Sequence, residues 1–405
     1  MRPPSRRSGI PSFIVMDVMR DANARVAAGH DVIHLEVGQP STPAPAVVRE
    51  AAARALATDR LGYTDALGLP ALRVRIARHY GERYGIDLDP SRVIVTAGSS
   101  AAFLLAFLAA FDPGDRLLVG LPGYPAYRHI PAATGIEVVP LALDAADRFQ
   151  LAAAHLEAAA RTADGSAEGS AEGAIGGSAE GAVQGAIVAS PANPTGSMLA
   201  PDELAALVAV AADRNLRLIS DEIYHGIGYG RPEATALAFG SEPIVVNSFS
   251  KYYSMTGWRL GWLIVPDNLV RPIECLTQNL YIAPASLSQH AALAAFDAGD
   301  ELEANVARYA ANRRLLLDAL PRLGVDRIAP ADGAFYLYVD IGHLSRDGAG
   351  FARRLLAETG VAVTPGNDFD PVAGGHFLRL SYAGATAEIA EAIRRFAAWG
   401  GFTLR

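Results

Sequence analysis

Short apolar runs rich in β-branched residues alternate with helical patterns along most of this chain, and this alternation constrains the fold more than any other feature. Six runs are predicted to be strands: RVIVTAG (92–98), RLLVGLP (116–122), GAIVASP (185–191), LRLISDE (216–222), PIVVNSF (243–249) and LGWLIVP (260–266). Helical patterns such as PDELAALVAVAADRN (201–215) lie between them. Strands separated by helices indicate a mainly parallel sheet with helices on both faces. The sequence therefore predicts a three-layer α/β/α domain.

The pattern changes in the last third of the chain. A long helical stretch leads to two further predicted strands, GAFYLYVD (333–340) and HFLRLSY (376–382), with a helix between them. This arrangement predicts a smaller α+β domain. We expect residues 1–45 to form an arm and part of that small domain, residues 46–285 the large domain, and residues 286–405 the rest of the small domain.

One segment has a different composition from its surroundings. Residues 165–185, GSAEGSAEGAIGGSAEGAVQG, contain the sequence Ser-Ala-Glu-Gly three times and show no apolar periodicity. Glycine-rich segments of this kind behave as flexible chains. We expect a flexible surface insertion within the large domain, with a functional lid as the alternative.

Charge and cysteine content exclude several classes of protein. The 405 residues carry a net charge of −8, and no basic block appears, which argues against nucleic acid as a partner. The single cysteine, Cys275, cannot form an internal disulfide, and we expect it to have a packing role in a reducing compartment. The apolar stretches 13–16 and 101–111 are too short for a signal peptide or a membrane span, respectively. A cytoplasmic protein without a metal site is expected.

Polar residues follow several predicted strands at the point where each strand ends. Lys251 comes just after PIVVNSF, and a lysine near a core loses its proton readily and becomes a nucleophile able to form a Schiff base. Ser99 opens a helix whose free N–H groups can bind an anion. Asp221 and Tyr224 follow another strand, and Asn193 lies between two prolines. Ligands bind at the carboxyl ends of strands in open α/β sheets, so these residues should converge.

These residues fit the requirements of pyridoxal phosphate, although each alone would be an ordinary loop or helix-cap residue. The cofactor needs a lysine, a carboxylate opposite its ring nitrogen, donors near its phenolic oxygen, and cations with hydroxyl groups around its phosphate. The residues that meet these four needs in turn are Lys251; Asp221; Asn193 with Tyr224; and Arg259 with Ser248 and Ser99.

Four motifs make the chain resemble a known family: NPTG (193–196), SDEIY (220–224), SFSK (248–251) and MTGWRLGW (255–262). Their order and spacing resemble the fold-type I, class I/II aminotransferases of the aspartate aminotransferase superfamily, over nearly the whole chain. The resemblance implies a pyridoxal-phosphate enzyme that moves the amino group of an L-amino acid to a 2-oxo acid by a ping-pong mechanism through a Lys251 aldimine.

The resemblance also implies roles for individual residues. Lys251 would carry the proton between the substrate and the cofactor, and Tyr124 would stack on the cofactor ring. Arg379 would bind the substrate α-carboxylate beside Gly38, and a planar guanidinium suits that task because it donates two parallel hydrogen bonds. Tyr63 would reach the phosphate of a neighbouring subunit, which implies a homodimer with shared active sites. The family pattern further places Ser99 and Ser100 at the phosphate, and Tyr124 and Asn193 beside the substrate.

The sequence also bears on three other functions. A nicotinamide-dependent dehydrogenase would show G-x-G-x-x-G after a strand, and this chain does not. A pyridoxal-binding transcription regulator would need a DNA-binding domain, for which the region before the family-like sequence is too short. A C–S β-lyase on the same fold remains an alternative, because both reactions begin with abstraction of the Cα proton.

One departure from the family pattern bears on the substrate. Members that act on dicarboxylates need a second cation, and Ser100 stands where one branch of the family has a lysine. No arginine lies between Arg271 and Arg308 to replace it. A buried carboxylate without a partner is disfavoured, so a neutral amino donor is expected. Arg128 and His225 remain as other sources of a positive charge.

Overall fold

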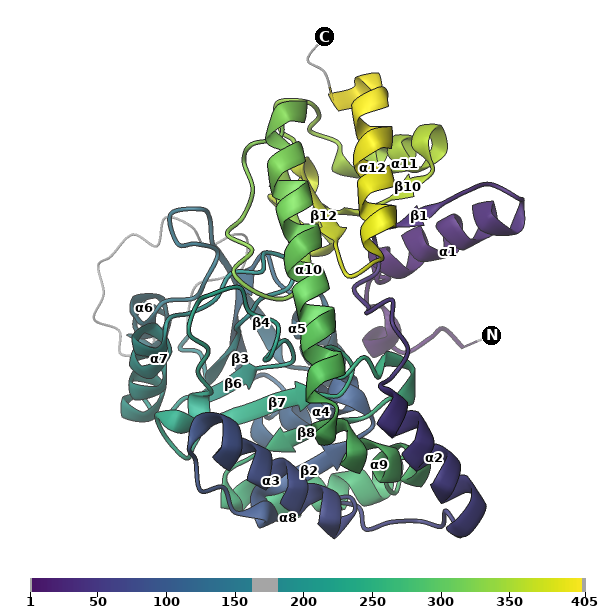
Figure 1. Ribbon diagram of the computed structural model, residues 1–405. Helices are drawn as coiled ribbons and strands as arrows, with labels where there is room; N and C mark the ends of the chain where they lie inside the picture. The colour runs from purple at the N-terminus through teal and green to yellow at the C-terminus, as the bar shows by residue number, and fades with distance from the viewer. Residues whose placement is uncertain (1, 162–180, 403–405) are drawn as a thin grey trace.

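A seven-stranded sheet forms the centre of the larger part of the molecule in the computed structural model, which describes residues 2–161 and 181–402 (Figure 1). Its strand order is β2-β8-β7-β6-β5-β3-β4. Only β8 runs antiparallel to its neighbours, so the predicted mainly parallel sheet is confirmed. The strands are β2 (Val93–Thr96), β3 (Arg116–Leu121), β4 (Glu137–Ala142), β5 (Gly185–Ala189), β6 (Arg217–Asp221), β7 (Ile244–Ser248) and β8 (Gly261–Ile264).

Helices cover both faces of this sheet because alternate strand residues point to opposite sides. In β2, Val93 and Val95 join a hydrophobic cluster with residues of α3 and α7, whereas Ile94 joins a second cluster with residues of α4 and α8. The three-layer architecture follows from this alternation. The helices of this part are α2 (Ala46–Thr58), α3 (Pro70–Tyr84), α4 (Gly98–Ala110), α5 (Ala126–Thr134), α6 (Ala153–Arg161), α7 (Pro201–Asp213), α8 (Asp267–Leu280) and α9 (Ser286–Ala292).

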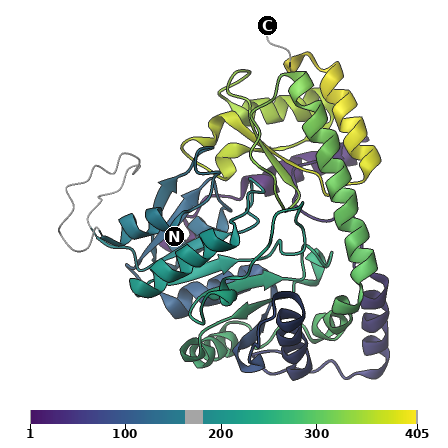
Figure 2. The ribbon, with the colours of Figure 1, turned by 60° about the vertical axis from the view of Figure 1, so that its left-hand side comes forward.

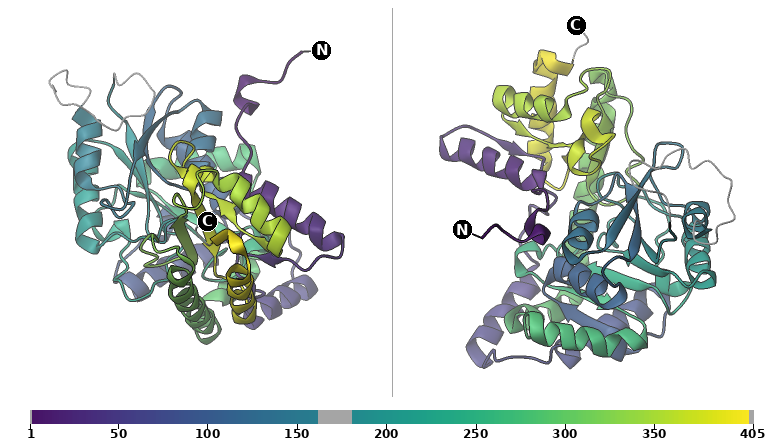
Figure 3. Two further views of the ribbon diagram at one scale, coloured as in Figure 1. Left: turned by 90° about the horizontal axis from the view of Figure 1, so that it is seen from above. Right: turned by 180° about the vertical axis from the view of Figure 1, so that it is seen from behind.

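The smaller part combines the C-terminal region with the N-terminal segment, as predicted. Its antiparallel sheet has the order β11-β12-β9, and a short parallel pair joins β1 to β10. Helix α1 contacts β10 and β11, and Figure 3 shows it beside the C-terminal elements. The elements are α1 (Ile14–Ala27), β1 (Ile33–His34), β9 (Tyr336–Asp340), α11 (Gly348–Thr359), β10 (Val361–Ala362), β11 (Thr364–Pro365), β12 (Phe377–Ser381) and α12 (Thr386–Ala398).

Helix α10 (Gly299–Ala319) joins the two parts and runs along both of them (Figure 2). Its Leu302 belongs to a hydrophobic cluster of the large sheet, whereas Tyr309 and Leu316 belong to the cluster of the small sheet. Helix α9 packs against α2 in the large part. The change from one hydrophobic core to the other therefore occurs within α10. The domain boundary predicted from the sequence lies earlier, at residue 285.

The predicted glycine-rich insertion falls mainly on residues 162–180, which lie outside the described residues. Residues 183–185, the last three of the predicted insertion, pack against the large sheet or belong to it. Val183 is buried in the core, and Gln184 Oε1 accepts a hydrogen bond from the backbone N–H of Arg116 in β3 at 2.7 Å. Gly185 is already the first residue of β5. Within the part of the chain that the structure describes, no helix has the length and apolarity needed to span a bilayer.

Candidate active site

A cavity of about 240 Å³ lies at the carboxyl ends of the parallel strands, where the small part meets the large sheet. Each of the strands β2, β3, β5, β6 and β7 is followed by at least one lining residue. The cavity brings together ten of the predicted residues: Gly38, Ser99, Ser100, Tyr124, Asn193, Asp221, Tyr224, Lys251, Arg259 and Arg379. The convergence expected from the parallel topology is therefore present.

Lys251 lies three residues beyond the end of β7 and lines this cavity. Its Nζ donates a hydrogen bond to the carbonyl oxygen of Gly38 at 2.6 Å and lies 5.8 Å from the ring centre of Tyr224. Burial lowers the pKa of Lys251 to about 7; the positive charges of Arg379 and Arg259 add to the shift, and Asp221 opposes it. A substantial fraction of this amine is therefore neutral near pH 7, which is the form that acts as a nucleophile or base.

Asp221 is the last residue of β6 and is buried. Tyr127 Oη donates a hydrogen bond to its Oδ2, and the backbone N–H of Ile223 donates to its Oδ1 at 3.1 Å. Burial raises the pKa of Asp221 to about 6, and both hydrogen bonds hold it lower than burial alone would. The carboxylate therefore remains mainly ionised at neutral pH and can bind a cationic ligand atom.

Arg379 in the middle of β12 is only 3% exposed. Its Nη1 donates to Asn193 Oδ1 at 2.8 Å, and its Nη2 donates to the carbonyl oxygen of Glu36. The guanidinium carbon lies 4.4 Å from the ring centre of Tyr336, which fixes its plane. Among the described residues, Nε has no hydrogen-bond partner and no acidic side chain bonds to this guanidinium. A buried cation in this state is suited to an anionic ligand.

An anion site is formed by the first turn of α4 and by Arg259. Gly98 opens the helix with a φ of +78°, and a Cβ at this position would lie 2.5 Å from Arg259 Nη2. The glycine therefore lets the guanidinium lie directly against the helix N-terminus. Ser99 and Ser100 follow in the same turn and line the cavity. Free N–H groups, the helix dipole and a guanidinium together favour a phosphate.

Two predicted residues do not line the cavity in this chain. Ser248 is buried, and its Oγ donates to the carbonyl oxygen of Leu260 at 3.0 Å, whereas Ser250 two residues later does line the cavity. Tyr63 is 86% exposed in the segment before α3. Its predicted role involves a second subunit.

Sequence reasoning missed two tyrosines that shape the site. Tyr127, the donor to Asp221, lies in the first turn of α5, and its position three residues after Tyr124 was an available signal. Tyr336 Oη lies 2.8 Å from Tyr224 Oη, and a Cβ on Gly38 would lie 1.7 Å from Tyr336 Oη. That contact joins distant parts of the chain, so no local pattern could have shown it.

The N-terminal segment is a further part of the cavity that was not predicted. Phe13, Val15 and Met16 line it, and the Phe13 ring lies 5.5 Å from that of Tyr124. The backbone N–H groups of Ile14 and Val15 donate to the Asp368 carboxylate at 3.0 and 3.2 Å and so fix the start of α1. This segment gives one wall of the cavity an apolar character.

Known proteins share the sequence pattern and the fold of this chain. Residues 30–396 match the family model described as Aminotransferase class I and II. The valine–pyruvate aminotransferase of Mycobacterium tuberculosis is 48% identical over 397 residues, which cover 97% of each chain. A crystal structure of an aminotransferase from Mycobacterium tuberculosis has a TM-score of 0.91 at 47% identity and covers 98% of this chain and 99% of that one. The aspartate aminotransferase from Thermus thermophilus with maleate has a TM-score of 0.89 at 30% identity, with 98% and 100% covered. The protein described here therefore belongs to the class I and II aminotransferase family.

Proposed function

We propose that this protein is a pyridoxal-phosphate-dependent aminotransferase that transfers the amino group of a neutral L-amino acid to a 2-oxo acid in two half-reactions. One observation carries the proposal: the Lys251 amine, with its lowered pKa, shares a single cavity with the Asp221 carboxylate and the buried Arg379 guanidinium. An amine, an acid and an anion site in one cavity are the groups that would bind this cofactor and the carboxylate of an amino acid.

The residues present fit the cofactor. The turn of α4 with Arg259 would hold the phosphate, and the buried Asp221 carboxylate would face the ring nitrogen. Asn193 and Tyr224 would lie near the phenolic oxygen, and Tyr124 would stack on the ring. When bound, the cofactor supplies an electron-accepting ring that stabilises negative charge at the substrate Cα atom.

Each residue then has a definite task in the reaction. Neutral Lys251 Nζ would take the proton from the substrate Cα atom and pass it to the cofactor rather than back to Cα, as transfer of the amino group requires. Arg379 binds the substrate carboxylate and thereby orients the Cα–H bond toward the lysine. Asp221, supported by Tyr127, retains the negative charge that keeps the ring nitrogen protonated.

The cavity lining supports a neutral donor. Its cationic residues in the described chain are Lys251, Arg259 and Arg379, and each already has a task. Arg128 donates to the carbonyl oxygens of Phe369 and Asp368 at 2.7 and 2.8 Å, and neither Arg128 nor His225 lines the cavity. The apolar lining residues are Phe13, Val15, Met16, Val37, Phe103 and Ile223. The relative that is 48% identical is named for valine and pyruvate, whereas several relatives near 30% identity are named for aspartate.

Steady-state kinetics with pyruvate as acceptor tests this proposal. We expect valine and alanine to give kcat/KM values above those of aspartate and glutamate, because the second carboxylate of an acidic donor would be buried without a cation. Double-reciprocal plots should give parallel lines, as a ping-pong transfer requires. A kcat/KM for aspartate about tenfold above that for valine would contradict the proposed donor class.

The proposed unit is a homodimer in which Tyr63 reaches the phosphate site of the partner subunit. The support is that Tyr63 is 86% exposed on a single chain although the family pattern assigns it a role at the phosphate. An exposed tyrosine that does not line the cavity of its own chain is placed to contact a site on another subunit.

A further inference from the structure

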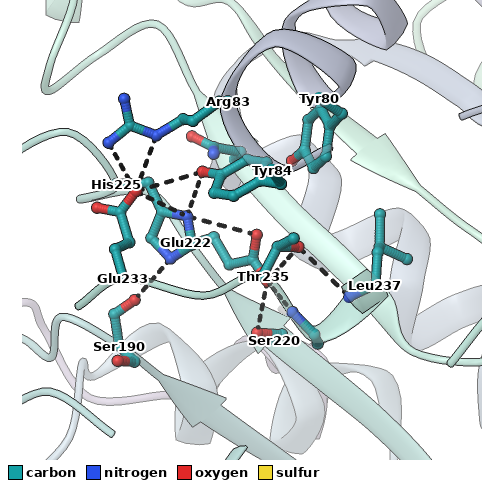
Figure 4. Close-up of polar contacts among 12 residues, drawn as sticks. Tyr80, Arg83, Tyr84, Ser190, Ser220, Glu222, His225, Glu233, Thr235 and Leu237 are labelled. Carbon is teal, nitrogen blue, oxygen red and sulfur yellow. Dashed lines mark hydrogen bonds and ion pairs between the residues drawn. The ribbon is translucent and has the colours of Figure 1, made fainter. Parts of the chain in front are cut away.

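Lys251 is the only lysine among the 35 lysine and arginine residues of this chain. The other residues of this set are arginines, whose guanidinium groups stay protonated in proteins and lack the free lone pair of an amine nucleophile. Figure 4 shows one of them: Arg83 donates from Nε and Nη2 to Glu233 Oε1 at 2.9 and 2.7 Å. The chain therefore offers one side-chain amine to a carbonyl compound, and this amine lies in the proposed cofactor cavity.

The Lys251 amine is in a state that can react. Among the described residues, its Nζ donates one hydrogen bond, to the carbonyl oxygen of Gly38 at 2.6 Å. This contact uses an N–H group and leaves the lone pair of a neutral amine without a partner. Burial lowers the pKa of Lys251 to about 7, so the neutral amine is present near pH 7. A neutral amine attacks the carbon atom of a carbonyl group.

The same cavity contains the anion site formed by the first turn of α4 and Arg259. Arg259 Nη1 donates to the carbonyl oxygen of Thr256 at 3.0 Å, and no acidic side chain in the described chain pairs with this guanidinium. Its positive charge is therefore available to a bound anion. Because the whole cavity measures about 240 Å³, a phosphate bound at this turn brings any small group attached to it close to Lys251 Nζ.

We propose that Lys251 is an acylation site in the cofactor-free chain, and that its acyl donor is a small acyl phosphate whose phosphate group binds at the turn of α4 and Arg259. Nζ attacks the carbonyl carbon atom of the donor, so a C–N bond forms and the bond from that carbon to the phosphate oxygen breaks. The electron pair of the broken bond leaves with inorganic phosphate, and the proton lost from Nζ passes to water.

The product of this step is a neutral amide on Lys251. An amide nitrogen cannot attack the carbonyl group of the cofactor, so acylation and attachment of the cofactor exclude each other. The supply of acyl phosphate would thus regulate how much of the newly made chain can become active. This acylation rests on the proposed function, because it uses the turn that is assigned to the cofactor phosphate.

Intact-mass spectrometry of the full chain counts the acyl groups. Cofactor-free protein is incubated with acetyl phosphate at about pH 7.5, and hydroxylamine then removes acyl esters and any thioester at Cys275. Besides acetylation of the N-terminal α-amino group, we expect one stable acetyl group on the wild-type chain. The holoenzyme and Lys251→Arg should not gain this group, because neither has a free side-chain amine.

Trypsin locates the acetyl group, because it cleaves after Lys251 only when the amine is free. The acetylated chain should give the uncut peptide 218–259, since Arg231 is followed by Pro232 and is not cleaved efficiently. The unmodified chain should give the two peptides 218–251 and 252–259.

Two acyl donors separate binding of the phosphate from the reactivity of the amine. Arg259→Gln should lower the rate of acetylation by acetyl phosphate about tenfold, because a charge-assisted contact to the phosphate is lost. The rate with N-acetoxysuccinimide, which has no phosphate, should change little. Arg271→Gln alters an arginine on α8 that is 72% exposed and is the matched control, with neither rate changed. On the wild-type chain, inorganic phosphate should slow acetylation by acetyl phosphate alone.

A cofactor-free wild-type chain without an acetyl group on Lys251 would overturn the acylation, and so would equal acetylation of the holoenzyme. Equal effects of Arg259→Gln on the two donors, or of inorganic phosphate on both, would overturn the role of the anion site. If the wild-type holoenzyme transfers no amino group, the proposed function fails, and the mass count still decides whether Lys251 is acylated.

Discussion

At the scale of single residues, the amine of Lys251 leads to a prediction about pH. Free lysine stays protonated up to about pH 10, whereas burial lowers the pKa of Lys251 to about 7. The neutral fraction of this amine therefore rises through pH 7. We expect enzyme stripped of cofactor to capture pyridoxal phosphate faster as the pH rises from about 6 to about 8, with a constant rate above that. Stopped-flow absorbance measures this rate, and a rate that still climbs between about pH 9 and 10 would contradict the assignment.

Asp221→Asn should lower the rate of transfer far more than the affinity for the cofactor. The anion site at α4 still holds the phosphate, but a neutral amide cannot keep the ring nitrogen protonated. We expect kcat to fall roughly 100-fold or more, with a change in Kd of less than about tenfold. Tyr127→Phe is the control, because it removes one hydrogen bond from Asp221 and leaves the charge in place. A proportional loss of rate and affinity would count against the role of Asp221.

The sequence predicts some of these residues and not others for a physical reason. Lys251, Asp221 and Asn193 each lie at or just after the carboxyl end of a strand, so one topological rule brings them together. Tyr336 lies against Gly38, which comes from the opposite end of the chain, and this contact depends on how the N-terminal segment packs on the C-terminal strands. Side-chain direction is a second limit. Ser248 and Ser250 lie two residues apart, and only the folded backbone decides which hydroxyl reaches the cavity.

At the scale of elements, Asp368 should control the N-terminal wall of the cavity. Its carboxylate accepts from the backbone N–H groups of Ile14 and Val15 and so caps α1. Asp368→Ala should destabilise this cap by about 1 kcal/mol. The Ile14 and Val15 amides should then exchange hydrogen faster, and KM for valine should rise while kcat changes little.

Asp21→Ala, an exposed substitution on the same helix, is the control for this effect and should change neither amide exchange nor KM. Unchanged exchange at Ile14 and Val15 in Asp368→Ala would show that the helix start is held by other contacts. The proposed link between α1 and the donor site would then be wrong.

Element boundaries show a similar limit to prediction. The six strands predicted for the large domain are all present. They could be predicted because long β-branched runs are typical of strands that are buried on both faces. Strand β4 was not predicted: it contains Pro140, which a central strand would exclude and which this edge strand, paired only with β3, tolerates. Val183 was placed in the glycine-rich segment because of the composition around it. In the structure its side chain is buried in a hydrophobic cluster of the large sheet, which depends on tertiary packing.

At the scale of the whole molecule, the proposed homodimer makes Tyr63 a test of shared active sites. Sedimentation equilibrium should give twice the chain mass of 42.5 kDa. Tyr63→Phe removes only a hydroxyl group, and losing one hydrogen bond to the cofactor phosphate should raise the Kd for pyridoxal phosphate about fivefold without dissociating the dimer. A monomeric enzyme with full activity would contradict the shared site.

The proposed reaction is the transfer of an amino group from a neutral donor by way of Lys251. The most direct measurement follows ¹⁵N from labelled valine with pyruvate as acceptor, detected by mass spectrometry. We predict that the label appears in alanine, with one alanine formed for each 2-oxo acid released from valine, and that Lys251→Ala abolishes this transfer while the protein stays folded. Label released as ammonia, as a lyase would produce, or undiminished transfer by Lys251→Ala would contradict the claim.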